Sequence, residues 1–304
     1  MLASRFPGFA RNLRYAKFNL RDIYDTYVAR PRPLQATPLG FIFGGSSSRH
    51  HAAMREGIFE PLEVALLTAL FPHTDRFIDI GANVGYFTCL ARHCGKPALA
   101  VEPMPRNLSA LFINLEANGW HDTEVQPLAA SNHVGIQTLF GASSTGASLI
   151  DRWAGAPSLF RRTICVSTLD NIVGSRFTAE RLMIKIDVEG HEHSALQGSR
   201  SLLDRACAPV WLIELTFHEY HPGGNNPTFQ SCFELFFSRL YRAFLLGPDG
   251  LAEITLRDVK GWVGAGRTSS ASVNYLFVPA DLEPLVPSLM QAAIRTPRQE
   301  EGLG

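Results

Sequence analysis

The sequence lacks three features, and each absence excludes a class of protein. It has only five cysteines, an odd number without a C-x-x-C pair, which argues against a disulfide framework or a zinc ribbon and favours a reducing, cytoplasmic compartment. It has no excess charge, because 28 Lys and Arg balance 28 Asp and Glu, so we expect no nucleic-acid partner. It has no apolar run near the roughly 18 residues of a membrane span and no signal-peptide core, so we expect no transmembrane segment.

The 304 residues, 46% of them hydrophobic, are enough for one large core, and we expect three parts. These are an N-terminal helix and linker (1–55), the main domain (56–285) and a C-terminal tail (286–304). In the first part, apolar residues step alternately by three and four, which predicts an amphipathic helix: Phe6, Phe9, Leu13, Ala16, Leu20, Ile23 and Tyr27. This helix packs on its own domain or on a dimer partner, or else lies on a membrane surface. Residues 31–51, with several Pro, Gly and Ser, are predicted to form a linker or mobile loop.

From residue 59 onward, predicted strands alternate with predicted helices, which indicates an α/β fold with a mostly parallel sheet flanked by helices. The expected strands are 76–80, 98–103, 123–130, 181–187 and 209–215. The expected helices are 60–71, the segment after the glycine turn up to 95, 105–119, 191–203 and 228–240. Residues 131–167 are less regular. Apolar runs around a Pro-Asp-Gly turn (242–255) and the segment 274–279 are expected to close the sheet, with one antiparallel strand.

The turn DIGANVG, which starts at Asp79, stands where a doubly wound sheet binds its nucleotide. The dinucleotide fingerprint has a glycine where this chain has Asn83, which disfavours a pyrophosphate and makes a Rossmann dehydrogenase a weaker interpretation. Gly81 suits a tight turn, and Gly85 suits close packing of the following helix. Glu102 ends the second strand 23 residues after Asp79, where an acid accepts hydrogen bonds from both ribose hydroxyls. A ligand with a ribose and a carboxylate but no phosphate describes S-adenosylmethionine.

Six segments resemble, in order and spacing, the FkbM family of S-adenosylmethionine-dependent methyltransferases: FIDIGANVGYF, VEPMPRNLSALFINLEANG, PLAASNHVG, STLD, IKIDVEGHEHSALQGSRSLL and IEL. They lie between about Phe59 and Phe217, and NYLFVP near the end resembles the closing strand of the family. The resemblance implies a class I methyltransferase-like (Rossmann-like) fold and methyl transfer to hydroxyl groups of sugars, glycans or secondary metabolites. It also implies the residues of the cofactor pocket, with the last two near the adenine: Asp79, Gly81, Asn83, Gly85, Glu102, Ala129 and Ser131.

Acids also end the next two predicted strands, on the same rim of the sheet as the cofactor turn. Asp187 is the first candidate for removing a proton from an acceptor hydroxyl, and Glu189 lies two residues further on. Asp187 with Glu214 forms an oxygen-ligand pair for a divalent metal such as magnesium, which lowers the pKa of a bound hydroxyl. His218, just after the fifth strand, is a further candidate base, and His191 is either a surface residue or a pocket base.

Two neighbours of this cluster, Glu192 and His193, fall in the first turn of the next helix, and we assign them no chemistry. The sequence therefore predicts an O-methyltransferase that uses S-adenosylmethionine and acts on a small-molecule or glycan acceptor. The alternatives are an N-methyltransferase acting on an amino sugar and a non-catalytic subunit that binds the cofactor or a glycan.

Overall fold

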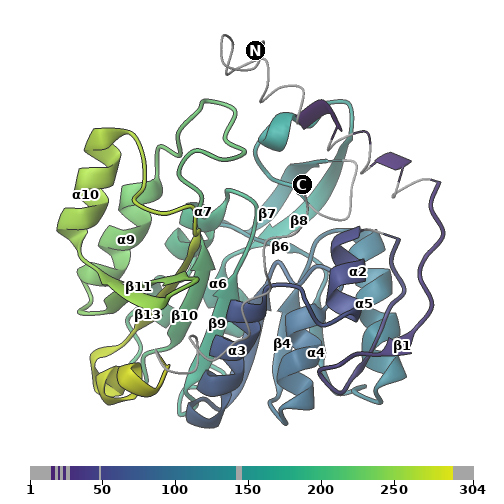
Figure 1. Cartoon of the computed structure of the whole chain (residues 1–304), viewed down its shortest axis with the longest axis horizontal. Helices are drawn as coiled ribbons and strands as arrows, with labels where there is room; N and C mark the ends of the chain where they lie inside the picture. The colour runs from purple at the N-terminus through teal and green to yellow at the C-terminus, as the bar shows by residue number, and fades with distance from the viewer. Residues whose placement is uncertain are drawn as a thin grey trace.

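The computed structural model describes residues 15–17, 20, 23–24, 28–47, 49–141 and 146–289. Its centre is an eight-stranded sheet in the order β12-β11-β13-β10-β9-β3-β4-β5, with helices on both faces (Figure 1). The five strands from β10 to β5 are parallel, whereas β13 runs antiparallel to both of its neighbours. These observations confirm the predicted α/β fold with a mostly parallel sheet.

The strands of this sheet are short and lie within the predicted apolar runs. They are β3 (Arg76–Ile80), β4 (Ala98–Val101), β5 (Glu124–Gln126), β9 (Leu182–Ile186), β10 (Val210–Glu214), β11 (Arg242–Gly247), β12 (Gly250–Ile254) and β13 (Asn274–Val278). The helices are α2 (Arg49–Arg55), α3 (Pro61–Leu70), α4 (Tyr86–His93), α5 (Pro105–Ala117), α6 (Leu169–Val173), α7 (Glu192–Gln197), α8 (Arg200–Leu203), α9 (Phe229–Phe237) and α10 (Leu256–Ala265). The helix α10 was not expected from the sequence.

Successive side chains of the central strands point to opposite faces of the sheet and build two apolar cores. Phe77 of β3 packs with residues of α3, α4 and α5, whereas Ile78 packs with residues of α6, α7, α8 and α9. Asp79 and Lys185 are register partners on β3 and β9, and both side chains are buried. By this alternation they lie on the same face as Phe77, so two charged groups sit beneath α3 and α4 near the carboxyl end of the sheet.

Two predicted elements are interrupted, one at a tertiary contact and the other at a proline. The helix expected at 191–203 is divided into α7 and α8 at Gly198, where a Cβ would lie 2.1 Å from the carbonyl oxygen of Ser131. The strand expected at 123–130 breaks at Pro127, which has no N–H to donate to a ladder. Its first half is β5 of the large sheet, and its second half is β6 (Ala129–Ala130) of a separate three-stranded sheet.

This small sheet, in the order β6-β8-β7, occupies much of the segment that was expected to be irregular. Strands β7 (Gly135–Phe140) and β8 (Arg161–Ser167) form an antiparallel ladder. β8 also pairs in parallel with β6. In the described part of the connection between β7 and β8, Gly146, Ala147 and Leu149 line a cavity together with Gly81 of the turn after β3.

The segment predicted as a linker at 31–51 packs into the domain, which corrects that prediction. Its strands β1 (Gln35–Ala36) and β2 (Ile42–Phe43) form a small hairpin, and Phe41 and Phe43 are fully buried against Tyr86. Most of the predicted N-terminal helix and residues 290–304 of the tail lie outside the described residues. No helix among the residues described is long and apolar enough to cross a membrane.

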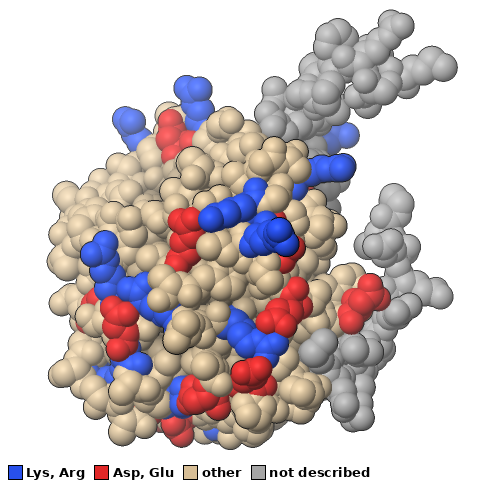
Figure 2. Space-filling model, turned by 90° about the vertical axis from the view of Figure 1, so that its left-hand side faces the viewer, with Lys and Arg blue, Asp and Glu red and all other residues tan. Residues whose placement is uncertain are grey.

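On the face shown in Figure 2, Lys and Arg side chains lie next to Asp and Glu side chains. Ion pairs of this kind join Arg242 to Glu253 and Glu283, and Arg239 to Asp204. Exposed pairs contribute about 0–1 kcal/mol each, so they make only a small contribution to stability.

Candidate active site

The turn after β3 presses against the end of β9. Gly81 has a φ of +84°, and a Cβ at this position would lie 1.8 Å from the carbonyl oxygen of Asp187. The N–H of Asp187 in turn donates to the carbonyl oxygen of Ile80 at 2.9 Å. Glycine is therefore required here both for its backbone conformation and for the close approach of the two strand ends.

Glu102 follows β4, and its buried carboxylate organises the floor of the site. Its Oε2 accepts the N–H of Asn83 at 2.9 Å, while Oε1 accepts the N–H of Met104 at 2.7 Å and Nδ2 of Asn107 at 3.2 Å. Burial raises the pKa of Glu102 to about 7. A carboxylate has about four acceptor positions, so roughly one remains for a ligand hydroxyl rather than the two hydrogen bonds expected from the sequence.

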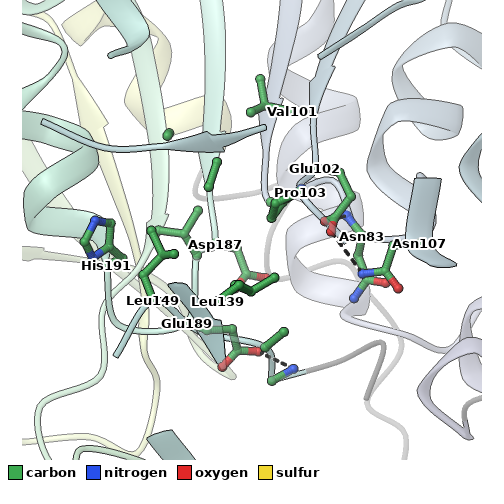
Figure 3. A pocket seen from close by; sticks show the side chains of 16 residues that line it. Asn83, Val101, Glu102, Pro103, Asn107, Leu139, Leu149, Asp187, Glu189 and His191 are labelled. Atoms are coloured by element: carbon green, nitrogen blue, oxygen red, sulfur yellow. Dashed lines mark hydrogen bonds between the residues drawn. The ribbon is translucent and has the colours of Figure 1, made fainter. Parts of the chain in front are cut away.

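A cavity opens between Glu102 on one side and His191 on the other (Figure 3). Its polar lining includes Asn83, Glu102 and Asp187, and its apolar lining consists of Val101, Pro103, Ala129, Ala130, Leu139, Ala147, Leu149 and Val188. The apolar walls suit a purine ring, and Glu102 suits a ribose. Oδ1 of Asn83 is buried without a hydrogen-bond partner among the described residues and offers an acceptor to an ammonium group. These groups fit S-adenosylmethionine.

The predicted cofactor residues divide into those that line this cavity and those that support it. Gly81, Asn83, Glu102 and Ala129 line the cavity. The other three stand behind it. Asp79 is buried and accepts a hydrogen bond from Oγ1 of Thr88, Gly85 packs against Leu111, and Oγ of Ser131 lies 3.3 Å from Nε2 of His191.

The sequence left His191 as either a surface residue or a pocket residue. In the structure it lines the cavity, which favours the pocket. Burial, together with His133 and His193, lowers the pKa of His191 to about 4. The imidazole is therefore neutral at pH 7 and offers one N–H donor and one acceptor nitrogen.

The next residue, Glu192, begins α7, and its buried carboxylate accepts the N–H of Gly190 at 2.9 Å. This agrees with its expected place at a helix start.

Glu189 lines the cavity, but both of its carboxylate oxygens are already engaged. Oε1 accepts the N–H of Gly146 at 3.1 Å, and Oε2 accepts Nε1 of Trp153 at 2.7 Å. Its backbone carbonyl accepts the hydroxyl of Ser148 at 2.6 Å. Glu189 therefore holds the connection between β7 and β8 against the cofactor cavity, and this geometry favours a positioning role over the base predicted from the sequence.

Asp187 follows β9 and has its side chain 26% exposed, facing the same cavity. Its Oδ2 lies 3.1 Å from Nζ of Lys185, a buried ammonium that also stands 4.8 Å from the centre of the Phe87 ring. Burial alone would lower the pKa of Lys185, but the carboxylates of Asp187, Glu60 and Asp79 outweigh this effect and raise it. Asp187 is thus an ionic partner with a second oxygen, Oδ1, left open.

Beyond Asp187, the predicted metal ligand Glu214 and an unpredicted acid, Glu60, complete a cluster. One carboxylate oxygen from each of the three residues lies within 4.8 Å of the other two. Glu60 directly precedes α3 and has a φ of +43°. The sequence shows Glu60 only as the acid before Pro61 at a helix start, so nothing in its local pattern indicates a site.

His218 does not line the cavity. Its Nδ1 lies 2.8 Å from Oδ1 of Asn225, and its ring packs against Phe217 with centroids 4.5 Å apart. The structure therefore places the predicted base His218 apart from Asp187 and Glu189, which meet at the cavity.

The sequence of residues 79–243, more than half of the chain, matches the model of the methyltransferase FkbM domain. The chain belongs to the FkbM methyltransferase family. This confirms the resemblance noted in the sequence, and the family implies S-adenosylmethionine as the cofactor. With its mostly parallel sheet and reversed β13, the domain is a class I methyltransferase-like, Rossmann-like fold.

Solved structures that resemble this FkbM-family chain are distant in sequence. A precorrin-6y C5,15-methyltransferase from Geobacter metallireducens has 12% identity and a TM-score of 0.35, over 60% of this chain and 73% of that one. A ribosomal protein L11 methylase from Lactobacillus delbrueckii subsp. bulgaricus has 11% identity and a TM-score of 0.34, over 60% and 69%. An rRNA methylase from Streptococcus thermophilus has 13% identity and a TM-score of 0.38, over 72% and 94%. No curated protein matches the sequence.

Proposed function

We propose that this FkbM-family methyltransferase transfers a methyl group from S-adenosylmethionine to an oxygen, namely a hydroxyl of a sugar, glycan or secondary metabolite. The observation that carries this proposal is the position of Asp187. Its carboxylate faces the cofactor cavity beside Gly81 and retains one oxygen that Lys185 does not occupy. A hydroxyl is a weak nucleophile, and a carboxylate placed against it removes the proton as the new bond forms.

When bound, S-adenosylmethionine supplies an electrophilic methyl sulfonium. Glu102 and Asn83 hold its ribose and amino-acid ends, and the walls that Glu189 fixes exclude water from the reacting atoms. Oδ1 of Asp187 would receive the proton of the acceptor hydroxyl as the methyl group is transferred, and S-adenosylhomocysteine would be the leaving product. The Lys185 ammonium holds the carboxylate of Asp187 in place through the 3.1 Å contact with its Oδ2.

The test uses the full chain with S-adenosylmethionine carrying a ¹³C-labelled methyl group and a panel of monosaccharides, amino sugars and hydroxylated aromatic compounds. We expect an oxygen-bound methyl product, identified by its ¹³C chemical shift. Asp187→Asn should reduce turnover by about 10²- to 10⁴-fold, the usual contribution of a general base. The matched control is Asp122→Asn, at an exposed carboxylate paired with Arg92, which should leave the rate unchanged. Full turnover in Asp187→Asn would show that another group is the base.

The second candidate is N-methyl transfer to an amino sugar. The observation that favours it is the excess of carboxylates around Asp187, which attracts a cationic amine. A nitrogen-bound methyl product would select this candidate. Binding of cofactor without methyl transfer to any of the acceptors would instead support a non-catalytic binding subunit.

The proposal also covers the cellular location of the protein, the class of its acceptor and the contact made by its N-terminal helix. All five cysteines are free, which supports a reducing, cytoplasmic location. The zero net charge supports a small-molecule or glycan acceptor rather than nucleic acid. A dimer or membrane-surface contact through the N-terminal helix stays a prediction. Measuring the solution mass of the chain with and without residues 1–32, together with its binding to anionic lipid vesicles, would test both forms of that contact.

A further inference from the structure

The buried and half-buried acids between α3 and the sheet differ in whether a neutral group donates a hydrogen bond to them. Asp79 accepts the hydroxyl of Thr88 at 2.6 Å, and Glu63 accepts Nδ2 of Asn274 at 2.7 Å. Neither Glu60 nor Glu214 has a side-chain hydrogen-bond donor among the described residues, and Asp187 has only Lys185. The acids without neutral donors are therefore the three whose oxygens converge.

The spacing of this trio, Glu60, Asp187 and Glu214, fits ligands around one small cation. Their oxygens lie within 4.8 Å of one another, although the three residues come from the turn before α3 and from the ends of β9 and β10. Hard divalent cations hold oxygen ligands at about 2.0–2.6 Å, so two ligands on opposite sides of the ion are about 4–5 Å apart. Side chains held by hydrogen bonds to one another would be closer, at about 2.5–3.0 Å between oxygens.

An independent observation indicates that a ligand is needed at this place. Oε2 of Glu60 is shielded from solvent and accepts no hydrogen bond among the described residues. Buried carboxylate oxygens are normally paired, because an unpaired one loses its hydration without compensation. The charges point the same way: when ionised, the three carboxylates exceed the single ammonium of Lys185, and the nearby Asp79 adds to this excess. A divalent cation reduces it.

We propose that Glu60, Asp187 and Glu214 together bind a hard divalent cation such as Mg²⁺ or Mn²⁺. The ligand set contains only carboxylates, without the Cys or His that zinc prefers. Asp187 also faces the cofactor cavity, so a cation bound to one of its oxygens would lie next to the acceptor side of the proposed methyl-transfer site. There it would orient the acceptor hydroxyl and lower its pKa, while the other oxygen of Asp187 would take the proton. The role in turnover rests on the proposed function, whereas the binding site itself does not.

The experiment measures Mn²⁺ binding to chelator-treated full-length protein by electron paramagnetic resonance and by calorimetry, without cofactor. We expect one Mn²⁺ per chain, displaced by excess Mg²⁺. Loss of an outer-shell partner alone costs about 10- to 100-fold in metal affinity, so E60Q and E214Q, which remove direct ligands, should each cost at least as much. The matched control is E63Q, which removes a nearby buried charge that Asn274 already pairs, and it should change affinity by less than about threefold. Equal affinities in E60Q, E214Q and E63Q, or the absence of Mn²⁺ binding in wild type, would overturn the proposal.

A second readout does not depend on the affinity assay. In chelator, E60Q should melt at a higher temperature than wild type, because it removes a carboxyl group whose shielded Oε2 loses its hydration without gaining a hydrogen-bond donor. Added Mg²⁺ should raise the melting temperature of wild type and E63Q but not of E60Q. An equal rise in all three proteins would contradict the site. If Mn²⁺ binds as described but no acceptor is methylated, the proposed function fails and the site stands; if methyl transfer proceeds equally in chelator, the role of the cation in turnover fails while the proposed function stands.

Discussion

The two sides of the active-site rim each contain carboxylates shielded at least in part from solvent, yet they are built in opposite ways. On the cofactor side, Glu102 accepts three hydrogen bonds from its own protein. On the acceptor side, Glu60 and Glu214 accept none from the side chains and backbone described. The first carboxylate is already organised to shape a binding surface, whereas the second pair has carboxylate oxygens without hydrogen-bond donors among the described residues, which leaves them free for something that binds. The comparison teaches that burial alone does not define the role of an acid; its hydrogen-bond donors do.

The largest effect is expected at Gly81, where the two sides meet. Gly81→Ala places a Cβ against the carbonyl oxygen of Asp187 in a left-handed backbone conformation, so we expect a loss of about 3 kcal/mol or more in the free energy of unfolding. Gly95→Ala is the control, because Gly95 has a similar φ of +76° but no atom within 4 Å of the added Cβ. It should cost about 1–2 kcal/mol. Urea denaturation of the two variants measures the difference, and equal losses would show that the two strand ends separate easily.

A smaller effect is expected when the cofactor side alone is changed. Glu102→Ala leaves the N–H groups of Asn83 and Met104 without their acceptor and removes the acceptor for the ribose. Hydrogen bonds to a charged group contribute about 1.5–3 kcal/mol, so the affinity for S-adenosylhomocysteine should fall about 10- to 100-fold. Asp187→Asn should bind S-adenosylhomocysteine as wild type does. Calorimetry measures the affinity of both variants for S-adenosylhomocysteine. An equal loss in the two variants would show that the cofactor side and the acceptor side are not separate.

The pH dependence of cofactor binding also tests the assignment of Glu102 as the acceptor for the ribose hydroxyl. Burial raises the pKa of Glu102 to about 7, so part of the free protein carries a neutral carboxyl group at pH 7. A ribose hydroxyl donates best to the ionised form, and binding therefore favours loss of that proton. The affinity for S-adenosylhomocysteine should rise about 3- to 10-fold between about pH 6 and about pH 8, because one pKa unit corresponds to at most a tenfold change. Glu102→Gln should show a flat profile, and a wild-type affinity that falls as pH rises would contradict this assignment.

The smallest effect is expected at the wall that Glu189 anchors. Ser148→Ala removes the hydroxyl that donates to the carbonyl oxygen of Glu189, which should lower the free energy of unfolding by about 1 kcal/mol. Because Gly146 and Leu149 line the cavity, the affinity for S-adenosylhomocysteine should also fall a few-fold. Ser288→Ala, at an exposed hydroxyl near the C-terminal end of the described chain, should change neither quantity. Thermal melts and calorimetry would detect both changes.

The positions of the rim acids were predictable from the sequence because parallel strands end at the same edge. Asp79, Glu102, Asp187 and Glu214 each stand at or just after the end of a short apolar run, and the alternation of strands and helices brings those ends together. The glycine turn was predictable for the same reason. Only the family resemblance assigned residues of β6 to the cofactor pocket. No local sequence pattern indicates that β6 pairs with β8 in a separate small sheet.

The partners of these acids were not predictable. Glu60 reaches the cluster from the turn before α3, and Glu189 takes its donors from Gly146 and Trp153 in a segment without regular periodicity. Such contacts depend on packing between parts of the chain that lie 36 or more residues apart, which periodicity does not encode. The break of the helix at Gly198 has the same cause, because the contact with Ser131 lies outside the helix itself.

The hairpin of β1 and β2 sets a practical limit on how this protein can be shortened. The N–H of Ile42 donates to Oδ1 of Asn118, and the N–H of Gly44 donates to Oδ1 of Asn114, so the hairpin is fastened along α5 by polar contacts as well as by Phe41 and Phe43. A fragment that starts at residue 56 would remove Phe41 and Phe43 from Tyr86 and would remove the hairpin N–H groups from Asn114 and from Asn118 at the end of α5. Fragments for crystallisation, fusion or display should therefore begin upstream of residue 31, even though the family pattern starts much later.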